Sequence, residues 1–143
     1  MNQNKLKSTQ KKSKDSSKSS ITTEINNFSV AEEVYERDPE ALEKYRQQRE
    51  KQGFDDTETW HLDRTLALFL IPRLERFIQV NNGFPTSETE ESYDEKLNFI
   101  LNSFKEYYYN ENEEVSLAIE KARLSNAKKA AALLGELWFD LWW

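Results

Sequence analysis

The chain contains no cysteine, only three glycines and three prolines, and a single histidine among 143 residues. The lack of cysteine excludes disulfide frameworks and thiolate metal sites, and it is compatible with a reducing compartment. The scarcity of glycine and proline disfavours sheet-rich folds, which need many tight turns. No apolar run is long enough for a transmembrane span, and the N-terminus lacks the apolar segment of a secretory signal. These absences predict a cytoplasmic protein without membrane contact.

Charge is divided unevenly along the chain. Residues 1–20 hold six lysines and one aspartate, a charge of +5, which leaves −11 for the remainder of a chain whose total is −6. This basic segment is mainly Lys, Ser, Gln and Asn, so it cannot offset its ordering entropy by burial, and we expect residues 1–27 to be disordered. A basic tail can contact nucleic acid. Its lysines are not interleaved with arginine or aromatic residues, which favours a solubilising role.

The remaining residues, 28–143, are expected to form a single domain. Asp38-Pro39 has the form of a helix N-cap followed by proline at the first helical position, and Gly53 is a natural C-terminal stop. Helical periodicity and such end signals predict helices at about 30–36, 39–52, 57–80, 92–109 and 113–141, with residues 81–83 as a left-handed end of the third. The last two helices each carry an apolar stripe, expected to face the core: Tyr93, Leu97, Ile100, Leu101, Phe104 and Tyr108 in the first, and Val115, Ile119, Ala122, Ala130, Leu133, Leu137 and Leu141 in the second. The fold class is therefore all-α, a bundle of about four helices.

The helix expected over 57–80 is the most apolar part of the chain. Its apolar face is predicted from the helical spacing of Leu62, Leu66, Leu70, Leu74 and Phe77. Further apolar residues widen this face to more than half of the circumference, so we expect the helix at the centre of the bundle. A proline at position 72 removes one backbone hydrogen bond, but the apolar phase continues across it. We therefore predict one kinked helix instead of two.

Four polar residues fall on apolar helix faces. Asp63 projects from the apolar face predicted for the 57–80 helix, on which Arg73 is a second anomaly, and Arg123 and Asn126 lie on the apolar stripe of the last helix. A carboxylate in such a position must find a partner or shift its pKa. Antiparallel packing of the two helices would let Asp63 meet Arg123. We expect a buried polar network, which more often specifies packing than catalysis.

The acidic stretch before Asp63 offers a different interpretation. Asp55, Asp56, Glu58 and His61 include a Glu-x-x-His spacing, which places both ligands of di-iron bundles on one helix face. Such sites use two of these motifs, and this chain has only one histidine. The competing interpretation is that Asp55, Asp56 and Glu58 stabilise a helix N-terminus while His61 is solvated. On balance we expect no metal and no cofactor.

A second enzymatic alternative comes from the segment Glu32-Glu33-Val34-Tyr35-Glu36. It is similar to the Glu-Glu-x-x-Glu of all-helical MazG-like nucleotide pyrophosphohydrolases, which hold magnesium with helix carboxylates. Those enzymes follow it closely with Glu-x-x-Asp, whereas here the best copy, Glu91-Ser92-Tyr93-Asp94, lies more than fifty residues downstream. The resemblance implies a metal-dependent nucleotide hydrolase only if folding brings these carboxylates together.

The C-terminus is unusually aromatic. Trp138, Phe139, Trp142 and Trp143 occur within six residues and spread around a helix, so one partner surface cannot cover them all. An exposed apolar patch of this kind often marks an interface. The alternative is that these residues dock onto the core of the same molecule. The aromatic tail therefore predicts either a protein interface or a terminal part of the core.

Residues 53–65 (GFDDTETWHLDRT) and 71–77 (IPRLERF), followed by 81–85 (NNGFP) and an aromatic 133–142 (LLGELWFDLW), resemble a group of small uncharacterised proteins of tailed bacteriophages. The resemblance implies a phage origin and a cytoplasmic setting in an infected bacterium, and it assigns no catalytic residue. The leading hypothesis is a non-enzymatic accessory protein that acts through helical protein–protein contacts, including homo-oligomerisation. The alternative is an all-helical enzyme or ligand-binding protein that uses the region between Asp55 and Asp63.

Overall fold

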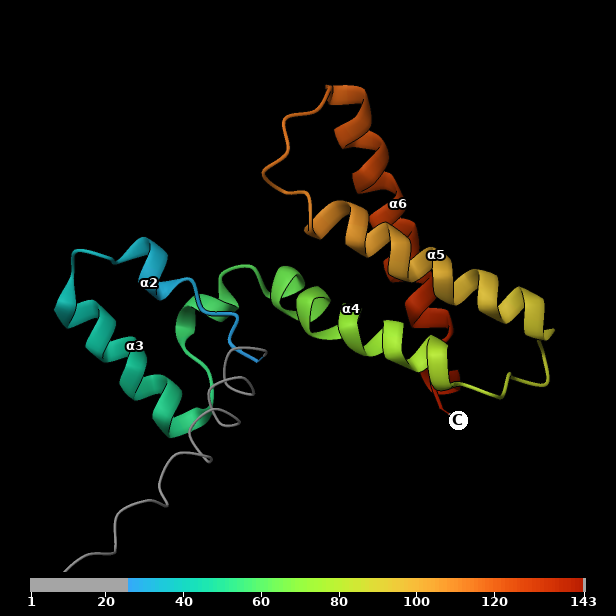
Figure 1. Ribbon diagram of the computed structural model, residues 1–143, viewed down its shortest axis with the longest axis horizontal. Coiled ribbons are helices and arrows are strands. Elements are labelled where there is room, and N and C mark those ends of the chain that lie inside the picture. The colour runs from blue at the N-terminus through green and yellow to red at the C-terminus, as the bar shows by residue number, and fades with distance from the viewer. Residues whose placement is uncertain (1–25, 143) are drawn as a thin grey trace, which may run out of the picture.

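The structure, a computed structural model, describes residues 26–142 (Figure 1). Within this range the regular elements are all helices, which confirms the predicted all-α class. The expected disordered tail, residues 1–27, lies outside the described residues except for Asn26 and Asn27, and so does Trp143. Between residues 26 and 142 no helix has the length and apolar character needed to cross a membrane.

Four long helices and three short ones follow one another along the described part of the chain; α denotes an α-helix and η a 3₁₀ helix. They are α2 (Ala31–Val34), α3 (Pro39–Gln52), η1 (Asp56–Thr59), α4 (Leu62–Val80), α5 (Glu90–Tyr108), α6 (Leu117–Glu136) and η2 (Trp138–Asp140).

The local signals around α3 act as predicted. The Asp38 side chain accepts a hydrogen bond from the backbone N–H of Ala41 at 3.0 Å, with Pro39 at the first helical position. Gly53 ends the helix in the left-handed region, at φ 86°, and its N–H donates to the Arg49 carbonyl at 2.8 Å. A side chain at this φ would be strained, which explains the glycine.

Other helix ends differ from the prediction because side chains bond the backbone two or three residues away. The expected 57–80 helix is divided into η1 and α4, since a capping box between Asp55 and Glu58 holds the first turn as a 3₁₀ helix. The last helix begins at Leu117, where Ser116 accepts from the N–H of Ile119, and not near residue 113. The left-handed end expected at residues 81–83 is absent: Asn81 is extended, and its side chain bonds both backbone groups of Gly83.

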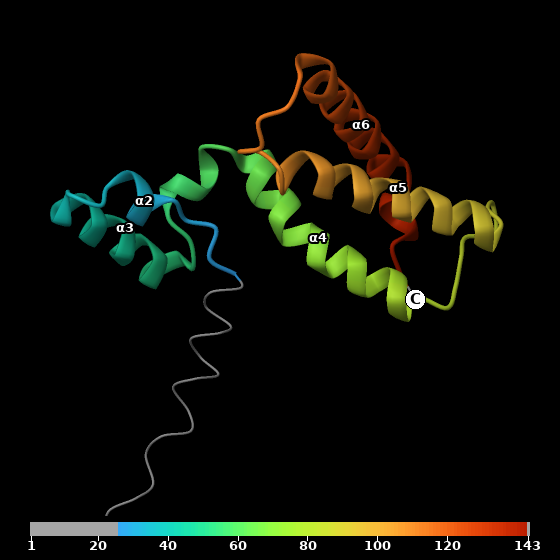
Figure 2. The same cartoon turned by 45° about the horizontal axis from the view of Figure 1, so that its top comes forward.

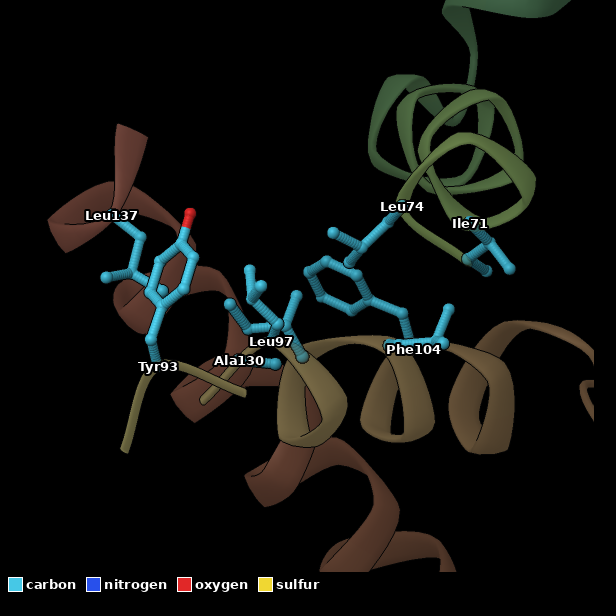
Figure 3. Packing of buried hydrophobic residues seen from close by; sticks show 9 residues of the cluster. Ile71, Leu74, Tyr93, Leu97, Phe104, Ala130 and Leu137 are labelled. Carbon is cyan, nitrogen blue, oxygen red and sulfur yellow. The ribbon is translucent and has the colours of Figure 1, made fainter. Parts of the chain in front are cut away.

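Helix α5 is the centre of the molecule, a position that the sequence analysis gave to α4. It packs against both α4 and α6. Its predicted apolar stripe is confirmed, and Figure 3 shows Leu74 of α4 pointing toward Phe104 of α5. The core cluster consists of Ile71, Leu74, Tyr93, Leu97, Ile100, Leu101, Phe104, Ala130 and Leu137.

The two helices that flank α5, α4 and α6, each bury only part of their apolar residues in the core. Helix α4 runs through Pro72 as one helix, as predicted, and it turns Ala67, Ile71 and Leu74 toward the core. Helix α6 crosses α5, so its C-terminal half is buried at Ala127 and Ala130 (Figures 1 and 2). Its N-terminal half extends past this crossing, and predicted core residues there, such as Ile119 and Ala122, are exposed. The elements that precede α4, namely α2, α3 and η1, gather at its N-terminal end (Figures 1 and 2).

Candidate functional site

The C-terminal residues 137–142, here called the aromatic segment, are held on the core by their aliphatic members. Leu137 is buried, and Leu141 packs against the core cluster. The hydroxyl of Tyr93 donates to the backbone carbonyl of Asp140 at 2.5 Å, which fixes η2 against α5. In both views the chain therefore ends beside the C-terminal end of α4 (Figures 1 and 2).

The large aromatic side chains of this segment face away from the core. The exposed fractions are 59% for Trp138, 89% for Phe139 and 64% for Trp142. The leucines dock onto the core while these aromatic rings remain outside it, so docking of the rings on the same molecule is not observed and the interface stays a prediction. Trp143, the fourth residue of the predicted interface, lies outside the described residues. The segment offers a rigidly placed apolar surface with indole N–H donors, which suits protein binding.

Helix α4 carries a second exposed apolar surface, which includes Leu62 and Leu66, two residues of the predicted core-facing side. The α4 stripe, as we call Leu62, Leu66 and Phe69, is exposed by 53%, 59% and 46%. The guanidinium of Arg73 stacks on the Phe69 ring, with its carbon 3.7 Å from the ring centroid, and donates to the Phe69 carbonyl at 2.8 Å. The apolar face spans more than half of the helix, so it contains two surfaces, and α5 covers only one of them.

The acidic stretch after Gly53 forms a buried polar cluster where α3 and η1 meet the non-helical segment before α2. The carboxylate of Asp55 accepts from the N–H of Thr57 at 2.9 Å, and that of Glu58 accepts from the N–H of Asp55 at 2.9 Å. Both carboxylates and Thr57 are buried. This is the reciprocal capping box of η1, so the interpretation of Asp55 and Glu58 as helix-end residues is confirmed.

Glu58 also ties the preceding chain to this cluster. Its carboxylate accepts from the N–H of Phe28 at 3.0 Å and from the guanidinium of Arg49 at 2.7 Å. The hydroxyl of Thr57 accepts from the N–H of Val30 at 3.1 Å and contacts the Ser29 hydroxyl at 3.2 Å. Ser29 is therefore used in this long-range contact and does not form a capping box for α2. Within residues 26–142, every buried side-chain polar atom has a partner.

This cluster does not have the properties of a metal site. Asp56 is exposed and bonds the amide of Gln48, and His61 is exposed at the start of α4. Among the described residues there is no group of three or more His, Asp or Glu side chains that could hold a metal ion. The metal interpretation of Asp55, Asp56, Glu58 and His61 is therefore wrong, because the two buried carboxylates are already engaged by backbone N–H groups and Arg49.

A cleft of about 650 Å³ lies beside the cluster, between α2, α3 and the non-helical segment that precedes α2. Both arginines in its wall are paired, since Arg46 bonds Glu43 and Glu50 while Arg49 bonds Glu58. The other acidic residues of the wall include Glu32 and Glu36, which are exposed to solvent. A hydrogen bond with Tyr35, followed by burial, raises the pKa of Tyr45 in the same wall to about 12. Tyr45 therefore stays protonated and neutral near pH 7.

The predicted buried network of Asp63, Arg73, Arg123 and Asn126 is also wrong. Asp63, Arg73 and Asn126 are exposed, and the Asp63 carboxylate accepts from the hydroxyl of Tyr108 at 2.9 Å. Arg123 instead pairs with two glutamates near the end of α5, Glu106 at 3.0 Å and Glu113 at 2.7 Å. The reason is that α6 crosses α5 and does not run along α4, so Asp63 and Arg123 never meet.

The carboxylates of the nucleotide-hydrolase alternative are not brought together. Glu32 and Glu33 are exposed on α2, whereas Glu91 and Asp94 are exposed at the start of α5. These two elements lie at opposite ends of the molecule in both views (Figures 1 and 2).

Comparisons of the chain with protein families, with curated proteins and with solved structures gave no match.

Proposed function

We propose that this chain is a non-enzymatic phage accessory protein that acts through protein–protein contacts, and that it self-associates through the aromatic segment. The proposed setting is the cytoplasm of an infected bacterium, which follows from the resemblance of residues 53–142 to tailed-phage proteins. The observation that carries the proposal is the outward position of Trp138, Phe139 and Trp142 on a segment that is itself fixed to the core.

Three large aromatic side chains in one short segment are more than a monomer commonly exposes. Tryptophan is enriched at binding hot spots, and a contiguous apolar patch on a soluble protein commonly marks an interaction site. Because Leu137 and Leu141 anchor the segment, little entropy is lost when the rings are covered by a partner. The acidic stretch, by contrast, is occupied by capping bonds and the ion pair with Arg49, which supports a structural role for it.

Sedimentation equilibrium of the full chain tests this function. We expect wild type to associate at tens of micromolar and the Trp138→Ala/Trp142→Ala variant to remain monomeric at the same concentration. The melting temperature of the variant monomer should stay close to that of wild type, because both rings are largely exposed. Leu117→Gln, at another exposed apolar position, is the matched control and should associate like wild type. A monomeric wild type would contradict the proposal.

A further inference from the structure

We propose that the α4 stripe is the surface on which the aromatic segment of a second copy docks, with each copy covering the other. This inference rests on the proposed self-association and adds the receptor surface. The stripe consists of Leu62, Leu66 and Phe69, whose spacing of four and three residues places them in one line on the helix. At 1.5 Å per residue this line is about 10 Å long, enough for two or three aromatic rings.

The aromatic segment cannot cover the stripe of its own molecule. The bond from Tyr93 to Asp140 and the packing of Leu141 hold the segment at the C-terminal end of α4. The stripe begins at the other end of α4, and Leu62 and Val80 are separated by roughly 27 Å along the axis. When two α4 helices lie antiparallel, the C-terminal end of each comes beside the N-terminal half of the other. The position of the segment therefore matches the stripe of a second copy.

The exposed areas favour this reciprocal arrangement over the pairing of like patches. The aromatic segment exposes roughly 400 Å² of ring surface, given 150–250 Å² for a whole aromatic side chain, and the stripe exposes roughly 300 Å². Either patch paired with itself would bury roughly 600–800 Å² in total, the size of a crystal contact. Reciprocal docking buries roughly 1,400 Å², which lies within the range of specific interfaces.

Charge also distinguishes the two patches. Arg73 and Arg76 continue the line of the stripe, and neither forms an ion pair within residues 26–142: Arg73 bonds Phe69 and Asn26, and Arg76 bonds Gln79. Glu136 and Asp140 border the aromatic rings and, in the same range of residues, likewise form no ion pair. A basic apolar stripe thus faces an acidic aromatic segment, and each fits the other better than itself.

A complementation experiment tests the docking. The stripe variant is Leu62→Gln/Leu66→Gln, and the segment variant is Trp138→Ala/Phe139→Ala; all four side chains are more than half exposed, so both chains should fold. We expect each variant alone to dissociate with a Kd at least ten times that of wild type. In an equimolar mixture, an intact segment meets an intact stripe. The heterodimer should therefore form several times more tightly than either homodimer, and raised salt should weaken it.

The outcomes separate this inference from the proposed function. If the segment variant is monomeric while the stripe variant associates like wild type, self-association through the aromatic segment stands and the α4 stripe is not its receptor. A mixture that associates no more tightly than the separate variants also overturns the docking. If only the stripe variant dissociates, α4 pairs with itself and both proposals are wrong. A monomeric wild type overturns both as well.

Discussion

The part of the molecule before α4 and the part from α4 onward are each stabilised by a different kind of interaction. In residues 26–61 the buried side chains are mostly polar, namely Asp55, Thr57 and Glu58. Thr57 and Glu58 bond the backbone of Val30 and Phe28, while Asp55 bonds Thr57. In residues 62–142 the interior is an apolar cluster built around α5. Each hydrogen bond contributes only about 0.5–1.5 kcal/mol net, whereas burying a large apolar side chain contributes about 1.5–3 kcal/mol.

This difference implies that stability is distributed unevenly. The part before α4 depends on a few directional bonds, so the loss of one partner leaves others buried and unsatisfied. The stability of the part from α4 onward depends on the apolar surface that it buries, and we expect this part to be the last to unfold. The surfaces that we propose for binding, the aromatic segment and the α4 stripe, both belong to this second, more stable part.

Leu97→Ala should cause the largest loss. Leu97 is fully buried on α5, within the core cluster formed by α4, α5 and α6, and we expect a cost of about 3–5 kcal/mol from the lost apolar contact and the cavity. Urea unfolding followed by circular dichroism measures it. Phe99→Ala, two residues away on the same helix, is the control and should cost about 2 kcal/mol or less, because the Phe99 side chain is 37% exposed. Equal effects would show that α5 is not the centre of the core.

Glu58→Ala should cost about 2–3 kcal/mol, and only in the part before α4. It removes the acceptor for the N–H groups of Phe28 and Asp55 and the partner of Arg49. Hydrogen exchange should then show faster opening around residues 28–31, with α5 unaffected. Glu32→Ala, an exposed carboxylate on α2, serves as the comparison and should change little. Destabilisation of α5 to the same degree would show that the two parts unfold as one unit.

Thr57→Val should cost about 1–2 kcal/mol. The change keeps the shape of the side chain but removes the hydroxyl that accepts from the N–H of Val30 and donates to Asp55. Chemical denaturation can compare it with Thr59→Val, whose exposed hydroxyl bonds only the nearby Asp56 carbonyl. If the two valine variants are equally stable, the link between Val30 and η1 contributes nothing.

Asp63→Ala should have the smallest effect on stability, about 0.5 kcal/mol or less, because Asp63 is exposed. Its measurable effect is on Tyr108, whose pKa is raised by burial and by the hydrogen bond to Asp63. A raised folded-state pKa contributes stability below pH about 10 that is lost as the pH rises further. Ultraviolet titration should show a lower Tyr108 pKa in the variant. A loss of several kcal/mol at neutral pH would restore the buried network that the sequence suggested.

Local signals and single clean stripes were predictable from the sequence, while choices between competing surfaces were not. Asp38, Gly53 and the stripe of α5 act as expected because each depends on near neighbours or on one unambiguous apolar face. The apolar residues of α4 cover too much of the helix to show which side meets α5, so Leu62 and Leu66 were placed in the core. The crossing of α6 over α5 and the bond from Val30 to Thr57 are tertiary features that no local pattern encodes.

Of the candidate sites predicted from the sequence, the aromatic segment agrees best with the structure. Its composition left open whether the aromatic rings lie at an interface or in the core, and the sequence could not show that the leucines dock while the rings stay exposed. The four polar residues of the expected network were misplaced for two reasons. Helix α4 turns another side toward α5, which leaves Asp63 and Arg73 exposed, and the assumed antiparallel contact of α4 with α6 is not formed. Arg123 forms ion pairs with the nearer carboxylates of Glu106 and Glu113, and Asp63 accepts a hydrogen bond from Tyr108.

Whether a second copy covers the aromatic segment is tested most directly by hydrogen exchange of the full chain at about 1 µM and about 100 µM, concentrations that bracket a micromolar Kd. We predict that backbone amides within residues 138–142 exchange more slowly at the higher concentration. Those of Phe28 and Asp55 should exchange equally at both, because they depend on intramolecular bonds. The same exchange rates within residues 138–142 at both concentrations would contradict the proposed self-association.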